Sequence, residues 1–220
     1  MRLRNDKNAK DYLAKQTKYI VLDPSLLKTD LKACFTNPNN PLYVEIGMGK
    51  GDFIINNAIK NPNINYLGIE KFQTVIVKAH KKALKHNLDN LMMLAYDANL
   101  IDQLLNQASV SKIFLNFSDP WPKNRHTNRR LTHPSFLAKF KYVLKEDGVI
   151  EFKTDNEGLF AYTINEVLLN DLQSYEILFL TYNLYQLKDN EQLINNIATE
   201  YEKKFVALNT RIKKVIFRYL

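Results

Sequence analysis

The sequence predicts an α/β fold in which a mostly parallel β-sheet is covered on both faces by helices. Segments typical of strands alternate with segments typical of helices from residue 42 to residue 153, with short connections between them. This alternation indicates a parallel sheet, because successive parallel strands are joined by helical crossovers. Three of the six glycines, Gly47, Gly49 and Gly51, follow the first strand directly. Ligands bind such sheets beyond the carboxyl ends of the strands, so we expect a site there.

Composition indicates a single domain with a basic character. At 220 residues and 45% hydrophobic content, the chain can bury a full core. We divide it into a basic N-terminal arm and lead-in, residues 1–37, and a domain at residues 38–220. The formal net charge is +8, as in many proteins that meet a polyanion, although many basic proteins bind nothing acidic. The sequence shows no export signal and no apolar stretch of about eighteen residues, so we expect a cytoplasmic protein without a membrane span.

The cysteines and histidines do not form a metal-binding pattern. Cys34 is the single cysteine, so an internal disulfide and a multi-cysteine metal site are excluded. His80 and His86 are six residues apart, whereas two zinc ligands on one helix are usually four apart. We therefore expect no metal, and Cys34 is interpreted as a filler of the core.

The first twenty residues are basic, mostly polar and weakly periodic. They allow two interpretations: a disordered or surface-packed terminus, or an arm that contacts phosphate through Arg2, Arg4 and Lys7. The loop Asn-Pro-Asn-Asn-Pro at residues 37–41 then separates this region from the first strand.

The first strand, the glycines and the following helix predict a small-molecule binding turn. An apolar run at Leu42–Ile46 predicts the strand, and residues 53–60 predict the helix. Glycine reaches positive φ and lets another group approach the backbone, and a helix N-terminus presents free N–H groups. The spacing Glu-x-Gly-x-Gly-x-Gly, which begins at Glu45, differs from the dinucleotide fingerprint Gly-x-Gly-x-x-Gly. A plain tight turn is the alternative.

Further elements follow in order along the chain. Strands are predicted at residues 64–70, 91–95, 112–117 and 149–153, and helices at residues 72–86 and 99–107. Another helix is indicated by one apolar face formed by Phe136, Leu137, Phe140, Val143 and Leu144, and we expect it to end near Gly148. After residue 170 the pattern favours strands at residues 175–180 and 212–219, which we expect to pair antiparallel at the sheet edge.

Acidic residues stand at or close to the ends of all five predicted parallel strands: Glu45, Glu70, Asp97, Asp119 and Asp155. We interpret them as one site, although any one of them could instead cap a helix or stabilise a turn. Glu70 lies nineteen residues after Gly51, which is about where an acid binds a ribose diol in doubly wound folds. Asp97 either accepts a hydrogen bond from an adenine amino group or caps the next helix.

Residues 116–130, Asn-Phe-Ser-Asp-Pro-Trp-Pro-Lys-Asn-Arg-His-Thr-Asn-Arg-Arg, are the most unusual stretch. Trp121, the single tryptophan, stands between two prolines, so the backbone there is rigid and non-helical. Lys123, Arg125, Arg129 and Arg130 follow within eight residues and predict contacts with the phosphates of a large substrate. A solvated basic loop is the alternative.

Four stretches taken together resemble the bacterial tRNA (guanine-N7)-methyltransferases, in the same order along the chain. They are E-I-G-M-G-K-G-D-F, then N-F-S-D-P-W-P-K-N-R-H with R-R-L-T-H-P, then F-K-T-D-N-E-G-L-F, and finally T-E-Y-E-K-K-F. The resemblance extends from about residue 2 to residue 205. It implies a three-layer, Rossmann-like class I methyltransferase sheet with an antiparallel C-terminal strand, S-adenosylmethionine as cofactor and tRNA as partner.

The resemblance also implies roles for particular residues. The cofactor would be held through Glu45, Glu70, Asp97 and Asp119, with Gly47 and Gly49 in the binding turn. Asp119 would be the catalytic residue. Substrate contacts would come from Lys123, Asp155, Thr199, Glu200, Tyr201 and Glu202. The RNA-contacting loop would be Asn124, Arg125, His126, Thr127, Asn128 and Arg129. The implied target is N7 of guanosine 46 in the tRNA variable loop, bound by a monomer or a homodimer.

Two places depart from the family pattern. The family often has Lys-Pro-Trp-Ala in its N-terminal arm, where this chain has Asp-Lys-Asn-Ala at residues 6–9. After the Lys-Phe pair the family usually has a glycine, where this chain has Asn209, Thr210 and Arg211.

Three other functions are compatible with parts of the pattern. A class I methyltransferase for a small molecule or a protein explains the glycines and acids, but gives no reason for the basic cluster. A non-enzymatic RNA-binding protein with the same fold predicts no tight cofactor binding. A nicotinamide-dependent dehydrogenase requires a different glycine spacing.

Overall fold

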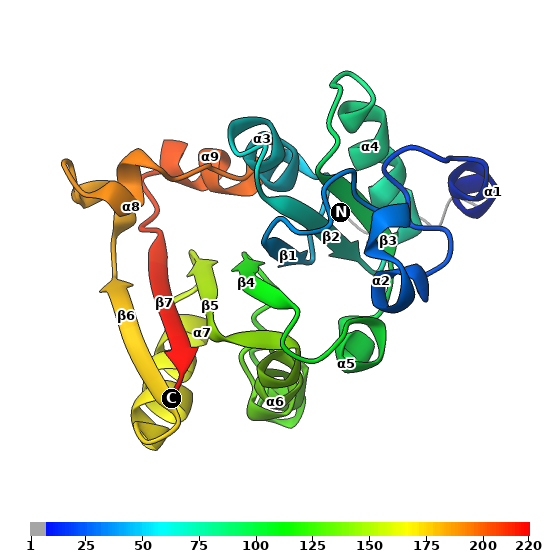
Figure 1. The fold of residues 1–220 in the computed structure, drawn as a ribbon. Helices are drawn as coiled ribbons and strands as arrows, with labels where there is room; N and C mark the ends of the chain where they lie inside the picture. Colours follow the sequence, from blue (N-terminus) through cyan, green and yellow to red (C-terminus); the bar gives the residue numbers. More distant parts are fainter. Residues whose placement is uncertain (1–7) are drawn as a thin grey trace.

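The computed structural model describes residues 8–220 and contains one seven-stranded sheet with the order β3-β2-β1-β4-β5-β7-β6 (Figure 1). The strands are β1 (Leu42–Ile46), β2 (Asn65–Glu70), β3 (Leu91–Ala95), β4 (Val110–Asn116), β5 (Leu144–Thr154), β6 (Tyr175–Thr181) and β7 (Lys213–Tyr219). Strands β1 to β5 are parallel, and β7 runs antiparallel to both β5 and β6. The predicted mostly parallel sheet with an antiparallel C-terminal strand is confirmed.

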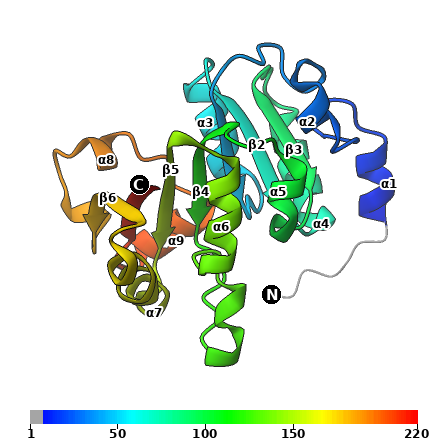
Figure 2. The same ribbon diagram turned by 60° about the horizontal axis from the view of Figure 1, so that its bottom comes forward.

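Helices cover both faces of this sheet, which gives three layers (Figures 1 and 2). One face carries α1 (Asn8–Ala14), α3 (Asp52–Lys60) and α4 (Gln73–Ala83). The other carries α2 (Leu26–Thr29), α5 (Ile101–Leu104), α6 (Pro134–Val143) and α7 (Glu157–Ala161), which continues into a π-helical segment, Tyr162–Leu168. Separate clusters of buried apolar side chains fill the two faces, so each helix layer has its own core.

The connection between β6 and β7 supplies two further helices, α8 (Glu191–Ile194) and α9 (Glu200–Ala207). Helix α9 lies beside α3 at the edge of the sheet, although the two are far apart in the sequence (Figure 1). This return of the chain towards the first helix after β1 shapes the candidate site.

The predicted end of the helix at Gly148 is wrong. Helix α6 ends at Val143, and Leu144 already pairs with Val110 as the first residue of β5. The register then shifts, so that Val149 is the next β5 residue paired with β4. A Cβ at Gly148 would lie 2.9 Å from the Lys145 carbonyl oxygen. Gly148 therefore permits a tight irregularity within a strand, and glycine is common both there and at a helix C-terminus.

The described part of the N-terminal region packs onto the domain. Ala9 and Leu13 of α1 are buried, and the Tyr12 hydroxyl lies 3.0 Å from Nδ1 of His80 on α4. Cys34 is buried in the core, as the sequence predicts. The predicted phosphate contacts of Arg2, Arg4 and Lys7 lie outside the described residues. No helix within residues 8–220 combines the length and apolar character needed to span a bilayer.

Candidate functional site

The glycine turn has the conformation that its sequence predicts. Gly47, Gly49 and Gly51 have φ values of 74°, 56° and 78°, all in the left-handed region. Gly51 is the N-cap of α3, and a Cβ there would lie 2.9 Å from the Cβ of Ala79. A Cβ at Gly47 or Gly49 would meet nothing within 4 Å. Conformation therefore favours glycine at all three positions, and the first two also leave open space for a ligand.

Two buried oxygen acceptors lie below this turn without a donor. Glu45 on β1 is 2% exposed and Asn116 on β4 is 7% exposed. The Asn116 amide nitrogen donates to Glu45 Oε1 at 3.0 Å, whereas Glu45 Oε2 and Asn116 Oδ1 have no hydrogen-bond partner among the described residues. Burial raises the pKa of Glu45 to about 7, against the opposing effect of the Asn116 hydrogen bond. Unpaired buried acceptors are costly, so this pair fits a ligand that brings hydrogen-bond donors.

Both acceptors line a cavity of about 470 Å³, to which the beginning of α9 also contributes. The glycine turn forms one wall, and Phe117 together with residues 199–201 forms another. Lys50 in the turn forms an ion pair with Glu200 at 2.7 Å, and the rings of Phe117 and Tyr201 have centroids 5.4 Å apart. Three segments that are remote in the sequence thus meet around one cavity.

Glu70 and Asp97 lie at the ends of the neighbouring strands and already have partners. Glu70 Oε2 accepts from the Gly49 amide at 3.2 Å, and Oε1 accepts from the Phe72 amide at 3.0 Å. Asp97 caps the following 3-10 turn by accepting from the Asn99 amide, and it pairs with Lys71 at 2.9 Å. The Lys71 hydrogen bond is the main cause of the lowered pKa of Asp97. The capping interpretation of Asp97 is confirmed, and the cofactor roles of both acids stay predictions.

The loop after β4 brings Asp119 to the same edge of the sheet. Phe117 and Trp121 have positive φ values of 51° and 41°, which are strained for bulky residues. Asp119 is exposed. Burial is the main cause of the raised pKa of the Tyr201 hydroxyl, and the carboxylates of Asp155 and Asp119 raise it further. Asp119 and Asp155 therefore both lie within electrostatic reach of the Tyr201 hydroxyl, beside the cavity that Phe117 and Tyr201 line.

The basic loop forms a 3-10 helix, Asn124–Arg129, that is built around Trp121. The Arg129 guanidinium lies 4.9 Å from the centroid of the Trp121 ring, and His126 contacts the same ring edge-on at 5.7 Å. Lys123, Arg125 and Arg129 are exposed. Solvent-facing cations on a structured loop are suited to phosphate contacts.

Arg130 differs from the other three cations, and its predicted phosphate contact is wrong. It is 9% exposed and donates to the Pro120 and Trp121 carbonyl oxygens at 3.2 and 3.1 Å. Its guanidinium also lies 4.3 Å from the centroid of the Tyr162 ring. Arg130 therefore holds the proline-tryptophan turn from below, and its charge faces the protein rather than solvent.

The structure gives Lys153 and Glu202 roles that the sequence did not predict. Glu202, a predicted substrate contact, is fully buried and pairs at 2.6 Å with the fully buried Lys153, to which no role was assigned. Glu202 also completes a capping box with Thr199 at the start of α9. The pattern Thr-x-x-Glu before an apolar-containing helix is the sequence signal for such a box. The corresponding signal for Lys153 is a lysine directly after Phe152 in a predicted strand of the sheet interior.

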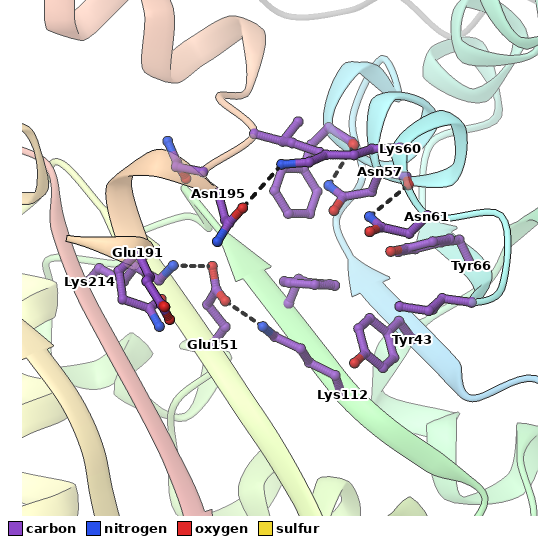
Figure 3. A pocket seen from close by; sticks show the side chains of 16 residues that line it. Tyr43, Asn57, Lys60, Asn61, Tyr66, Lys112, Glu151, Glu191, Asn195 and Lys214 are labelled. Carbon is purple, nitrogen blue, oxygen red and sulfur yellow. Dashed lines mark hydrogen bonds and ion pairs between the residues drawn. The ribbon is translucent and has the colours of Figure 1, made fainter. Parts of the chain in front are cut away.

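A second cavity, of about 320 Å³, lies over the sheet next to α3 (Figure 3), and Phe53 lines both cavities. Figure 3 shows Glu151 between Lys112 and Lys214, with distances of 2.6 and 2.8 Å. Burial opposes ionisation of Glu151, but the two ammonium groups outweigh it and lower its pKa to about 2. We interpret this group as a structural ion network. Within residues 8–220, no group of three or more histidine, cysteine, aspartate or glutamate side chains could hold a metal.

Comparison with known proteins agrees with these features. The family model described as "Putative methyltransferase" matches residues 39–215. The chain is 68% identical over 220 residues to the tRNA (guanine-N(7)-)-methyltransferase of Ureaplasma urealyticum serovar 10, covering 100% of this chain and 98% of that one. It is 43% identical over 216 residues to the enzyme of the same name from Lachnoclostridium phytofermentans, covering 98% and 97%.

Solved structures show the same fold at low sequence identity. One is an antibiotic-related methyltransferase, with a TM-score of 0.60, 18% identity and coverage of 94% of this chain and 98% of that chain. Another is an rRNA methylase from Streptococcus thermophilus, with a TM-score of 0.54, 14% identity and coverage of 100% and 99%. Because the family model and the close relatives span nearly the whole chain, the chain belongs to the bacterial tRNA (guanine-N(7)-)-methyltransferase family.

Proposed function

We propose that this protein transfers a methyl group from S-adenosylmethionine to N7 of a guanosine in tRNA, at position 46 of the variable loop. The proposal rests mainly on one observation: the glycine-lined cavity and the basic loop share one rim. The donor-less acceptors of Glu45 and Asn116 face the glycine-lined cavity, and the loop with Asp119 and the exposed cations begins at the wall of that cavity. Family membership supports the reaction and the substrate class.

The residues around the cavity fit S-adenosylmethionine. Its ammonium group brings N–H donors, which match Glu45 Oε2 and Asn116 Oδ1. Gly47 and Gly49 leave room beside the backbone. We assign Glu70 to the ribose hydroxyls and Asp97 to the adenine amino group. When bound, the sulfonium supplies an electrophilic methyl group.

Asp119 and Asp155 are suited to orient guanine. N7 of guanine carries a lone pair and no proton, so the transfer needs alignment rather than an obligatory base. A carboxylate can accept hydrogen bonds from guanine N1–H and the exocyclic amine, which distinguishes guanine from adenine. It also offsets the positive charge that develops on the methylated purine. Tyr201, half-exposed between these acids and Phe117, can contact the base as well.

Mass analysis of tRNA nucleosides tests the proposal. Unmodified tRNA is incubated with the purified protein and S-adenosylmethionine, then digested completely. We expect 7-methylguanosine, and we expect it to disappear when the transcript carries adenosine in place of guanosine 46. No methylated nucleoside would exclude the activity. Methylation of another base or of a different guanosine atom would exclude the assigned target.

The exposed cations of the basic loop predict salt-dependent tRNA binding. Arg129→Ala and Lys123→Ala should each weaken tRNA binding several-fold and reduce the slope of log affinity against log salt by about 1. With one protein cation fewer, binding releases about one counterion fewer from the tRNA. Binding of S-adenosylhomocysteine, measured by calorimetry, should not change. Lys145→Ala is the matched control, since Lys145 is exposed at the beginning of β5, away from the carboxyl ends of the strands. An unchanged salt slope would remove the residue concerned from the phosphate contacts.

A further inference from the structure

The segment at residues 196–202 shapes the site but belongs to no strand of the sheet. It contributes Thr199, Glu200 and Tyr201 to the wall of the 470 Å³ cavity. It follows a polar connection with only short helical turns, η6 (Leu184–Gln186) and α8. Most backbone hydrogen bonds of residues 183–196 close turns within the connection itself. They do not tie it to the sheet, so another interaction must fix the position of Tyr201 beside Asp119 and Asp155.

A buried ion pair anchors the base of this segment to β5. Lys153 Nζ donates to Glu202 Oε2 at 2.6 Å and to Asn196 Oδ1 at 2.8 Å, and it lies 3.4 Å from the Ile197 carbonyl oxygen. Both charged side chains have 0% exposure. The three donors of the ammonium group are thus directed at one side chain of α9 and two residues of the connection that precedes it.

The Glu202 carboxylate accepts the other hydrogen bonds of this network. Its Oε1 accepts from the Tyr185 hydroxyl at 3.0 Å and from the Asn196 amide nitrogen at 2.8 Å. Its Oε2 also accepts from the Thr199 amide at 3.2 Å, and the Thr199 hydroxyl accepts from the Glu202 amide at 2.9 Å. Burial and then the Glu202 carboxylate raise the pKa of Tyr185. The network thereby sets where α9 begins and which way residues 199–201 face.

The tip of the same segment is held far more weakly. Lys50 and Glu200 pair at 2.7 Å, but their side chains are 44% and 54% exposed. Exposed pairs of this kind are screened by salt and contribute little. The placement of Tyr201 against Phe117 and the two aspartates therefore depends on the buried base rather than on the exposed tip.

A buried ion pair is a poor source of stability, because desolvation of both charges offsets their attraction. Apolar residues of similar volume often stabilise such a site equally well. The pair between Lys153 and Glu202 requires a reason other than stability, and its connections lead to the cavity wall.

We propose that Lys153 and Glu202 are positioning residues for methyl transfer: their buried pair fixes residues 196–202 so that Thr199 and Tyr201 stand beside Asp119 and Asp155. The inference rests on the proposed function, since it concerns the placement of the guanosine substrate. Neither side chain touches the substrate, because both are enclosed by protein.

The test compares Lys153→Met/Glu202→Leu with wild type in a tRNA methylation assay. We expect the double variant to melt within a few degrees of wild type, because both charges are removed together. We expect its kcat to fall at least about tenfold, since misplaced contacts lower the chemical step. Arg218→Met/Glu176→Leu is the matched control, because it also removes both charges of an ion pair on the same sheet, and Arg218 pairs with Val149 at the end of β5 away from the site. Its kcat should equal that of wild type.

A double-mutant cycle separates positioning from general structural damage. If the pair acts through Tyr201, combining Lys153→Met/Glu202→Leu with Tyr201→Ala should lower kcat scarcely more than either change alone. Additive losses, or a wild-type kcat in the folded double variant, would overturn the inference. Should the double variant fail to fold, Lys153→Met/Glu202→Gln takes its place with the same expectations, because it also removes both charges and keeps a side-chain acceptor for Tyr185 and Thr199. An inactive wild-type protein would instead overturn the proposed function, so the two failures are distinguishable.

Discussion

Replacing Asp119 with alanine is expected to reduce methyl transfer at least about a hundredfold, the usual cost of removing one group that stabilises transition-state charge. Asp119 is exposed at the rim, in the same electrostatic neighbourhood as Asp155 and Tyr201. The variant loses both a hydrogen-bond acceptor for the guanine edge and a negative charge beside the developing purinium. The single-turnover rate with tRNA and saturating cofactor measures the effect on chemistry directly.

The fold of this variant should remain intact. Surface substitutions of this kind usually change the free energy of unfolding by less than about 0.5 kcal/mol. Asp147→Ala provides the matched control, because Asp147 is also an exposed acid but lies near the beginning of β5, at the other end of the strands. Near wild-type turnover by the Asp119 variant would show that this carboxylate is not the catalytic group.

Glu45→Gln is expected to weaken cofactor binding about tenfold to a hundredfold at pH 8. The substitution keeps the size of the side chain but removes the charge that would pair with the methionine ammonium, and a hydrogen bond to a charged group contributes roughly 1.5–3 kcal/mol. Since the pKa of Glu45 in the free protein is about 7, wild-type affinity should rise with pH up to about 7 and then level off. The glutamine variant should lack this dependence.

The same substitution should make the free protein more stable. Burial raises the pKa of Glu45 from 4.5 to about 7. Between these values the folded state binds more protons than the unfolded state, so the contribution of Glu45 becomes less favourable as the pH rises. At pH 8 the full cost applies, about 3 kcal/mol for a shift of this size. Removing the ionisable group should recover much of it.

Two measurements check this variant together. Calorimetric titration with S-adenosylhomocysteine at pH 6, 7 and 8 gives the affinities, and urea unfolding at the same pH values gives the stabilities. Asn116→Asp is a useful comparison, because it adds a second buried carboxyl next to Glu45 and should sharpen the pH dependence of stability. Unchanged cofactor affinity and unchanged stability in Glu45→Gln would mean that the buried Glu45 carboxylate neither destabilises the folded protein nor binds the ammonium.

The local sequence was sufficient to predict the structure where one segment supplies all the interactions that determine it. The strand, glycine turn and helix at residues 42–60 were predicted within one residue, because apolar periodicity and the conformational freedom of glycine act over a few positions. The edge of the sheet that carries the acids was predictable for the same reason. Each acid lies near or just after the end of its own strand, and parallel strands end at the same edge.

Prediction failed where a distant partner decides what a residue does. Gly148 was misassigned because a strand irregularity and a helix C-terminus both favour glycine. Arg130 stands in a run of cations, yet the carbonyl oxygens of the turn before it and the Tyr162 ring draw it inwards. Neither contact could be inferred from the charge pattern alone.

By itself, the sequence determined the alternation of strands and helices from residue 42 to residue 153, the conformation of the glycine turn and the edge of the sheet at which the acids gather. Only the tertiary structure decided that Glu202 turns inwards to Lys153, 49 residues before it, and that Glu200 reaches Lys50 across 150 residues. The physical reason is the range of the interactions. Backbone conformation and periodic burial are set by near neighbours, whereas a buried charge takes its role from whichever partner the completed fold places beside it.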